Sequence, residues 1–257
     1  MRMRDEQASI WDEKSSSYPR CKAILQNSFE SQIINKFIEL GINFNSHIVD
    51  VGCGTGIFSL YIAKLAKSVL CVDISLKMLE ILKNDANNLG VNIDIFCGNF
   101  WQIDKKFDLA FLSRSPAVYD EESASMFLEL ADKIAYINHI KPMYNSIITP
   151  VLNGFECQKN IFIFSEFLKQ NNIHYKRKKI VEKNVVTQNV FEIFDSLLWH
   201  LKINKIQFNL NKVLEFLEDD LKDDFIYFFE NPVMRDTLKH KTKTFIKEST
   251  YEMVVVG

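Results

Sequence analysis

The chain has 257 residues, of which 47% are hydrophobic and 25% are charged, so it is long enough and apolar enough to bury one large core. The formal net charge of −2 gives no overall positive field. We therefore expect neither a nucleic-acid partner nor an anionic lipid surface as a partner.

The ends and the cysteines place further limits on the class of protein. The N-terminal residues lead directly into polar sequence, and nowhere do about 18 apolar residues follow one another, so we expect a cytoplasmic protein with no membrane association. The five cysteines contain no Cys-x-x-Cys pair, which is typical of reduced, buried thiols. They are Cys21, Cys53, Cys71, Cys97 and Cys157. The five histidines are scattered, so no metal site is expected.

Apolar periodicity and capping residues predict an alternation of helices and strands through the first half of the chain. In chain order these elements are a helix at 29–40, a strand at 47–51, a helix at 57–66, a strand at 68–73, a helix at 76–89 capped by Ser75, strands at 91–97 and 107–112, a helix at 121–134 capped by Asp120 and a strand at 135–140. This alternation predicts an α/β fold with a doubly wound, mainly parallel Rossmann-like sheet and helices on both faces.

After Pro142 the alternation loosens. The elements expected there are a helix at 158–169, a strand at 175–186, helices at 190–201 and 214–228 and a strand at 250–256 that adds an edge or antiparallel strand. We interpret 1–257 as a single domain. Its parts are an N-terminal helical cap at about 1–45, a core at 46–141, a mostly helical insertion at 142–240 and a terminal strand at 241–257.

A glycine loop follows the first strand. Gly52, Gly54 and Gly56 allow the main chain to approach a ligand closely, and Asp73 ends the second strand. A carboxylate in that position can accept hydrogen bonds from two ribose hydroxyls, so the two features together predict a nucleoside site. A glycine loop alone is weak evidence, because a tight turn between strand and helix needs glycine as well.

Residues 49–56, VDVGCGTG, closely resemble the first motif of class I S-adenosylmethionine-dependent methyltransferases, and 72–79, VDISLKML, resemble the segment that follows it. The resemblance covers about 11–140, and the chain looks most like the small-molecule group called type 11 or type 25. It implies S-adenosylmethionine as the cofactor and S-adenosylhomocysteine as the product. A dehydrogenase is the alternative for such a pattern, but dinucleotide sites prefer G-x-G-x-x-G, whereas this chain has G-x-G-x-G.

The resemblance also implies a set of donor-binding residues: Tyr18, Asp50, Gly52, Cys53, Gly54, Gly56, Asp73, Ile74, Met78, Asn99, Phe100 and Ser113. The glycine loop and Cys53 would line the methionine moiety, Asp50 would support the loop or the donor's amino group, and Asp73 would hold the ribose. Ile74 and Met78 would pack against adenine.

Asn99 replaces the acidic residue that the family usually has at the adenine amino group. Its side-chain oxygen can accept the same hydrogen bond, and the alternative is that Asn99 only turns the chain. Tyr18, together with residues 11–13, would close over the donor, or would belong to an ordinary amphipathic terminus.

The acceptor is less well defined by the sequence, because methyl transfer needs alignment more than specific catalytic groups. Arg114, Tyr119 and His139 are the candidates for binding the acceptor or acting as a base. The alternatives are that Arg114 is an exposed surface residue, that Tyr119 only leads into the next helix, and that His139 has a structural role. Residues 115–118, SPAV, depart from the Asn/Asp-Pro-Pro-aromatic motif of nucleic-acid base methyltransferases. We expect a small-molecule acceptor between 113–119 and the helical region after Pro142. A protein or RNA methyltransferase and a non-catalytic donor-binding scaffold are the alternatives, and no oligomeric state is predicted.

Overall fold

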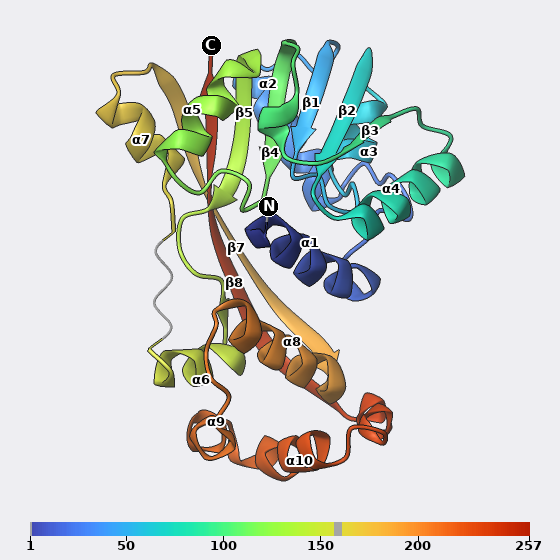
Figure 1. The fold of residues 1–257 in the computed structure, drawn as a ribbon, viewed down its shortest axis with the longest axis vertical. Coiled ribbons are helices and arrows are strands. Elements are labelled where there is room, and N and C mark those ends of the chain that lie inside the picture. Colours follow the sequence, from blue (N-terminus) through green and yellow to red (C-terminus); the bar gives the residue numbers. More distant parts are fainter. Residues whose placement is uncertain (1, 157–160) are drawn as a thin grey trace. The chain divides into compact units, whose positions relative to one another are not determined.

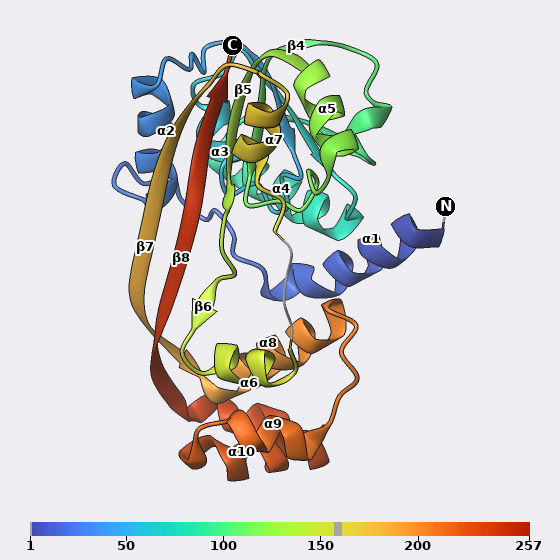
Figure 2. The same ribbon diagram turned by 90° about the vertical axis from the view of Figure 1, so that its left-hand side faces the viewer.

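The computed structural model describes residues 2–156 and 161–257 (Figures 1 and 2). Cys157 and the start of the helix predicted at 158–169 lie outside the described residues. The chain divides into two compact units: unit 1 contains Met1–Ile140, Phe162–Ile180 and Tyr251–Gly257, and unit 2 contains Lys141–Ile161 and Val181–Thr250. The predicted insertion at 142–240 differs from unit 2 mainly at 162–180, which belongs to unit 1.

Unit 1 is built on a mainly parallel sheet. Its strands are β1 (His47–Val51), β2 (Ser68–Asp73), β3 (Asp94–Cys97), β4 (Phe107–Ser113), β5 (Ala131–His139) and the last part of β8 (Thr242–Val256). They are arranged in the order β3-β2-β1-β4-β5-β8. The first five are parallel, and β8 pairs with β5 in antiparallel register from Ile134↔Val256 to His139↔Tyr251. The predicted doubly wound sheet is confirmed.

Helices cover both faces of this sheet, because its central strands bury side chains on both sides. One face packs against α2 (Phe29–Glu39), α3 (Ser59–Ala63) and α4 (Leu76–Leu89), and the other packs against α5 (Glu121–Glu129) and α7 (Phe164–Gln170). In β4, for example, Leu109 and Phe111 belong to the first core, whereas Ala110 and Leu112 belong to the second. This alternation places the sheet between two helical layers.

The predicted helix caps are present. Ser75 Oγ accepts the N–H of Met78 at 3.2 Å, and Asp120 Oδ1 accepts the N–H of Ser123 at 2.8 Å. The helix predicted at 121–134 was too long: it ends at Glu129, and Ala131 pairs with Phe107 as the first residue of β5. The apolar residues at 131 and 134 lie in a buried strand, and their positions continue the helical spacing only by coincidence.

Three smaller differences concern the same half of the chain. The helix predicted at 57–66 is the short α3, and the strand predicted from 91 begins at Asp94. Leu76, the first residue of α4, is apolar but 53% exposed. Cys97 was expected to be buried, yet it is exposed, because β3 is an edge strand of the sheet. The other cysteines in the described part of the chain are buried or partly buried and carry free thiols.

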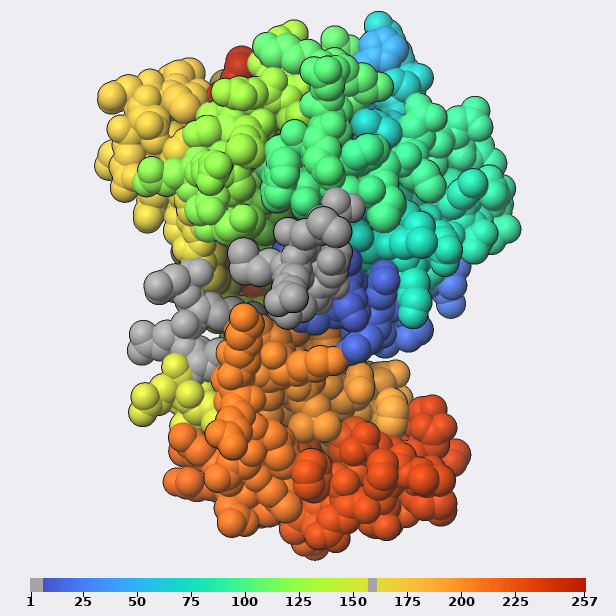
Figure 3. All heavy atoms as spheres, in the orientation of Figure 1, coloured from blue at the N-terminus to red at the C-terminus, as the bar shows by residue number. Residues whose placement is uncertain are grey.

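An N-terminal helix, α1 (Arg2–Lys14), is followed by the 3₁₀ turn Ser15–Ser17. Asp12 Oδ1 accepts a hydrogen bond from Ser75 Oγ at 2.5 Å and another from the N–H of Lys77 at 3.2 Å. Figure 3 shows α1 (blue) against the teal atoms of α4. Asp12 thus places a negative charge at the N-terminus of α4, where the helix dipole favours one.

Unit 2 is mostly helical. It contains β6 (Tyr144–Asn145), α6 (Ile148–Gly154), the second half of β7 (Tyr175–Asn189), α8 (Val190–Ile203), α9 (Leu210–Phe216), α10 (Asp219–Glu230), the 3₁₀ helix η3 (Arg235–His240) and the first part of β8. Its own core includes Phe194, Phe225 and Phe228. The single helix predicted at 214–228 was wrong, because Leu217 has extended backbone angles that separate α9 from α10.

None of the helices in residues 2–156 and 161–257 is long and apolar enough to cross a membrane.

Candidate functional site

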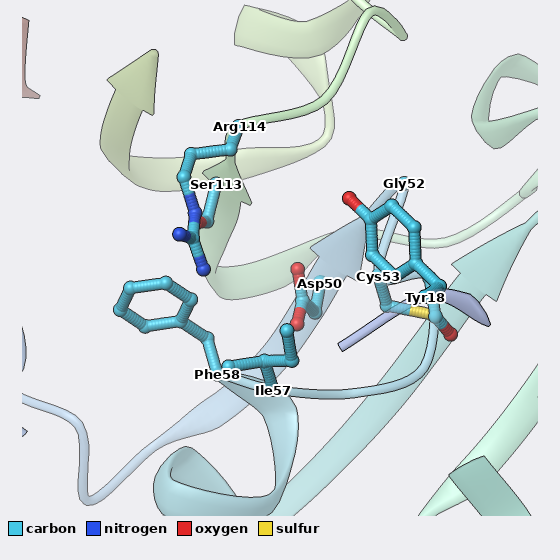
Figure 4. A pocket seen from close by; sticks show the side chains of 9 residues that line it. Tyr18, Asp50, Gly52, Cys53, Ile57, Phe58, Ser113 and Arg114 are labelled. Carbon is cyan, nitrogen blue, oxygen red and sulfur yellow. The ribbon is translucent and has the colours of Figure 1, made fainter. Parts of the chain in front are cut away.

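A pocket lies at the carboxyl ends of β1 and β4, where the strand order of the sheet changes direction (Figure 4). The residues that line it come from three separate segments of unit 1. They are Tyr18, Asp50, Gly52, Cys53, Gly54, Ile57, Phe58, Ser113 and Arg114. In open α/β sheets such a switch point is the usual place for a ligand.

The glycine loop forms the first wall of the pocket. Gly52, Gly54 and Gly56 have φ angles of +66°, +54° and +80°, a conformation that favours glycine. A Cβ on Gly52 would lie 1.8 Å from Ser115 Oγ, and one on Gly56 would lie 2.0 Å from Leu82 Cδ1. The loop is therefore closely packed on its protein side. The N–H groups of Gly52 and Cys53 both donate to the carbonyl of Val72, at 2.8 and 3.0 Å, and this fixes the loop against β2.

Replacing Gly52 with alanine should lower the free energy of unfolding by about 2 to 3 kcal/mol, because strain at positive φ adds to a steric overlap with Ser115. Gly90 is the matched control, since its φ is +61° and a Cβ there would meet nothing within 4 Å. Gly90→Ala should cost only about 1 kcal/mol. Denaturant unfolding of the two variants measures both values. Equal losses would show that the contact with Ser115 is unimportant, whereas recovery in Gly52→Ala/Ser115→Gly would support it.

Asp73 lies at the end of β2 and is half-buried. Its Oδ2 accepts the N–H of Gly54 at 2.8 Å, and its Oδ1 accepts the N–H of Ser75 at 2.9 Å. Burial raises the pKa of Asp73, and these backbone hydrogen bonds oppose that rise. Each carboxylate oxygen retains a second lone pair, so the group that holds the glycine loop can also accept hydrogen bonds from a ligand.

Asp50 lies in β1 and is 2% exposed. Its Oδ2 accepts a hydrogen bond from Ser59 Oγ at 2.6 Å. Burial raises the pKa of Asp50 from 3.8 to about 7, although the hydrogen bond from Ser59 lowers it. A positively charged ligand group in the pocket would stabilise the ionised carboxylate.

Tyr18 is held over the glycine loop by the chain on both sides of it. A Cβ on Gly54 would lie 3.7 Å from Tyr18 Cε1, and the carbonyl of Pro19 accepts a hydrogen bond from the buried Thr55 Oγ1 at 2.6 Å. The ring of Trp11 contacts Tyr18 edge to face, with centroids 6.2 Å apart. Burial raises the pKa of the Tyr18 hydroxyl, while the charge of Arg114 lowers it. The segment before α2 is thus a wall of the pocket.

Arg114 lies directly after β4 and has a φ of +49°, which is unusual for a residue with a side chain. Its N–H donates to the carbonyl of Ile137 at 2.8 Å. The guanidinium lies over the rings of Phe58 and Phe29, 5.3 and 5.6 Å from their centroids. Figure 4 shows its side chain running along Phe58 into the pocket.

Ser113, the last residue of β4, presents an orphaned polar atom to this pocket. Its buried Oγ has no hydrogen-bond partner among the described residues. A buried hydroxyl in that state loses its interaction with water without compensation, which is expected where a ligand would complete the hydrogen bond.

The pocket brings together six of the predicted donor-binding residues, namely Tyr18, Asp50, Gly52, Cys53, Gly54 and Ser113. Other predicted positions lie elsewhere in unit 1. Met78 and Phe100 are each 2% exposed, and Asn99 precedes the 3₁₀ turn Phe100–Gln102, with its N–H bonded to Gln102 Oε1 at 2.9 Å. Ile74 follows β2 and is partly buried.

The acceptor-side candidates are not all part of this pocket. Tyr119 is 58% exposed and its N–H donates to Ser123 Oγ, so it leads into α5. The ring of His139 packs against that of Tyr251, with centroids 4.5 Å apart. Arg114 alone among the three lines the pocket.

Ile57 and Phe58 are lining residues that sequence reasoning missed. They follow the glycine loop directly, but their apolar character suggested only the start of a helix. The helix begins two residues later than predicted, at Ser59, and this leaves both side chains free to line the pocket.

No group of three or more metal-ligating side chains was found in the part of the chain that the structure describes.

The parallel sheet and the glycine loop at its switch point define a Rossmann-like domain with a nucleoside-type pocket. Residues 48–134 match the family model of a methyltransferase domain of the type 25 group. The resemblance predicted from the sequence is therefore confirmed over this segment, which is similar to methyltransferase domains.

Individual relatives agree with this assignment. The chain is 30% identical over 140 residues to a ribosomal protein L11 methyltransferase from Helicobacter acinonychis (strain Sheeba), which is 51% of this chain and 42% of that protein. It is 38% identical over 63 residues to a ubiquinone biosynthesis O-methyltransferase from Coxiella burnetii (strain Dugway 5J108-111), which is 24% of this chain and 27% of that protein. The chain thus spans less than half the length of these relatives.

The fold is similar to the crystal structure of magnesium protoporphyrin IX methyltransferase from Synechocystis PCC 6803 with bound S-adenosylhomocysteine. The TM-score is 0.52 at 16% identity, over 71% of this chain and 92% of that chain. This likeness concerns the fold.

Proposed function

We propose that the chain is an S-adenosylmethionine-dependent methyltransferase that acts on a small molecule. The observation that carries the proposal is the pocket at the switch point of the sheet, where the glycine loop, Asp50 and Ser113 converge. The match of 48–134 to a methyltransferase domain supports the same activity.

The residues of the pocket fit S-adenosylmethionine. The glycines of the loop carry no side chain that would block an amino-acid tail, and the unpartnered Ser113 Oγ can bond a polar ligand atom. Asp73, which holds the loop at Gly54, has lone pairs for two ribose hydroxyls. The bound donor supplies a methyl group on a sulfonium, which transfers by in-line displacement. The protein's part is therefore to hold both reactants in line and to exclude water.

Three observations favour a small-molecule acceptor. The net charge of −2 offers no overall attraction for nucleic acid, and residues 115–118 lack the motif of base methyltransferases. The chain also matches the ubiquinone biosynthesis enzyme of Coxiella burnetii, and the name of that enzyme indicates a small-molecule acceptor. His139 and Tyr119 remain the proposed acceptor-side bases, and a cover formed by the region after Pro142 remains a prediction.

A protein acceptor is the second candidate. The match to the ribosomal protein L11 methyltransferase of Helicobacter acinonychis extends over 140 residues, which is longer than the match to the ubiquinone enzyme.

Titration calorimetry should show that S-adenosylmethionine and S-adenosylhomocysteine bind and that NAD does not, because the glycine loop lacks the dinucleotide spacing. At a hundred times its dissociation constant, each sulfur nucleoside should stabilise the fold by about 2.7 kcal/mol. If NAD bound and neither sulfur nucleoside did, the assignment of the fold would stand but the proposed methyltransferase activity would be contradicted.

A second experiment separates the acceptor classes. Incubation of the protein with a cell lysate and methyl-labelled S-adenosylmethionine should place label in the metabolite fraction, and mass spectrometry would then identify the product. Label in protein would favour the second candidate, and label in RNA would contradict both. Donor binding without label in any fraction would indicate a donor-binding scaffold.

A further inference from the structure

We propose that Arg114 binds the α-carboxylate of the donor's methionine tail, and that it therefore belongs to the donor site and not to the acceptor site. The inference rests on the proposed function, because it assigns one part of the donor to one residue of the same pocket.

The charges that line the pocket match an amino acid with both termini ionised. Of the nine lining residues in the described part of the chain, Asp50 carries the carboxylate and Arg114 the guanidinium. The tail of S-adenosylmethionine carries one ammonium and one carboxylate on the same carbon. If its ammonium lies at Asp50, Arg114 is the cationic lining residue that its carboxylate can meet within the same pocket.

Arg114 is held in place for this role before any ligand binds. Its backbone is fixed at a φ of +49° by the hydrogen bond to Ile137, and its guanidinium lies over the rings of Phe58 and Phe29. Cation–π contacts on two rings restrict the orientation of the guanidinium plane. A residue ordered in advance loses little conformational entropy when a ligand binds.

The hydrogen-bonding capacity of the guanidinium is not used up by its acidic neighbour. The nearest carboxylate oxygen, Glu30 Oε1, lies 3.8 Å from Arg114 Nη2, which is longer than a hydrogen bond. The Arg114 side chain is 28% exposed and that of Glu30 is 18% exposed. Glu30 thus balances the charge of Arg114 in the free protein and competes weakly with an incoming carboxylate.

The test compares two nucleosides that differ only in the tail. S-adenosylhomocysteine carries the amino acid, whereas 5′-methylthioadenosine has the same nucleoside and thioether without it. Calorimetry should show that Arg114→Gln weakens S-adenosylhomocysteine binding by about tenfold and changes 5′-methylthioadenosine binding by less than about twofold. Arg114→Lys should recover part of the loss, since it keeps the charge but not the fork.

Two further variants separate a direct contact from a structural effect. Glu30→Gln should strengthen S-adenosylhomocysteine binding, because it removes the competing carboxylate. Arg235→Gln is the matched control, since Arg235 also lies over a phenylalanine ring, 4.4 Å from the centroid of Phe228, but belongs to unit 2. It should leave both nucleosides unaffected.

Unchanged S-adenosylhomocysteine binding in Arg114→Gln would overturn the assignment and return Arg114 to the acceptor side. Equal weakening of both nucleosides would overturn it as well, because the residue would then only shape the pocket. If the unaltered protein bound neither nucleoside, the proposed function itself would fail, and the inference would fail with it.

Discussion

Replacing Asp73 with alanine should weaken the binding of S-adenosylhomocysteine by about 2 to 4 kcal/mol, whereas Asn99→Ala should cost about 1 kcal/mol. A carboxylate can accept two charge-assisted hydrogen bonds from the ribose, while the amide accepts one neutral bond from adenine. The structure adds a second reason, because Asp73 also holds the N–H groups of Gly54 and Ser75. The loss should therefore include some disorder of the glycine loop.

Calorimetric titration of the two folded variants measures this difference. Asp73→Asn helps to separate the two contributions, since an amide oxygen can still accept one of the backbone hydrogen bonds. Its loss should lie between those of Asp73→Ala and the unaltered protein. Equal and negligible losses in Asp73→Ala and Asn99→Ala would show that the ribose lies elsewhere.

Replacing Asp50 with asparagine should raise the free energy of unfolding at about pH 8 by on the order of 4 kcal/mol and change it little at about pH 4. Burial raises the pKa of Asp50 from 3.8 to about 7, so between these values the folded protein keeps a proton that the unfolded chain has released. The contribution of this group to stability therefore falls as the pH rises from about 4 to about 7. An amide does not ionise and avoids the loss.

Denaturant unfolding of both proteins across this pH range measures the effect. Asp73, whose pKa burial also raises, is present in both proteins, and its charge contributes to the raised pKa of Asp50. Asp104→Asn changes an exposed aspartate and serves as the control. Parallel pH profiles for Asp50→Asn and the unaltered protein would contradict the prediction. The stabilised variant should bind the donor more weakly, because it lacks the charge that attracts an ammonium group.

The central strands could be predicted from the sequence almost to the residue. Strands β1 and β2 have the predicted bounds, because each is a short apolar run buried on both faces and broken by a glycine or an acidic residue. Apolar periodicity predicted the wrong helix bounds where apolar residues beyond the end of a helix continued its spacing. Ala131 and Ile134 continue the spacing of α5 into β5, and Leu217 and Leu221 keep one spacing across the break between α9 and α10.

The candidate site could be predicted in part, for a similar reason. Motif residues such as Asp50 and Gly52 are recognised by their position after a strand, and both line the pocket. The direction of a side chain after a strand depends on backbone angles that a sequence does not express. Arg114 has a φ of +49°, and its side chain lines the same pocket as Asp50. The sequence predicted an acceptor-side role for this residue but could not give the direction of its side chain.

The antiparallel pairing of β8 with β5 has a consequence for synthesis of the protein on the ribosome. Strand β5 ends at His139, but its partner residues Tyr251–Val256 are translated more than a hundred residues later. At about 5 to 20 residues per second, the edge of β5 stays without this partner for on the order of ten seconds. During this interval the buried side chains of β5, such as Ile134 and Ile137, lie beside an unpaired strand edge. Newly made chains should therefore depend on chaperones that shield such an edge, and should aggregate more readily when translation after residue 140 is slowed.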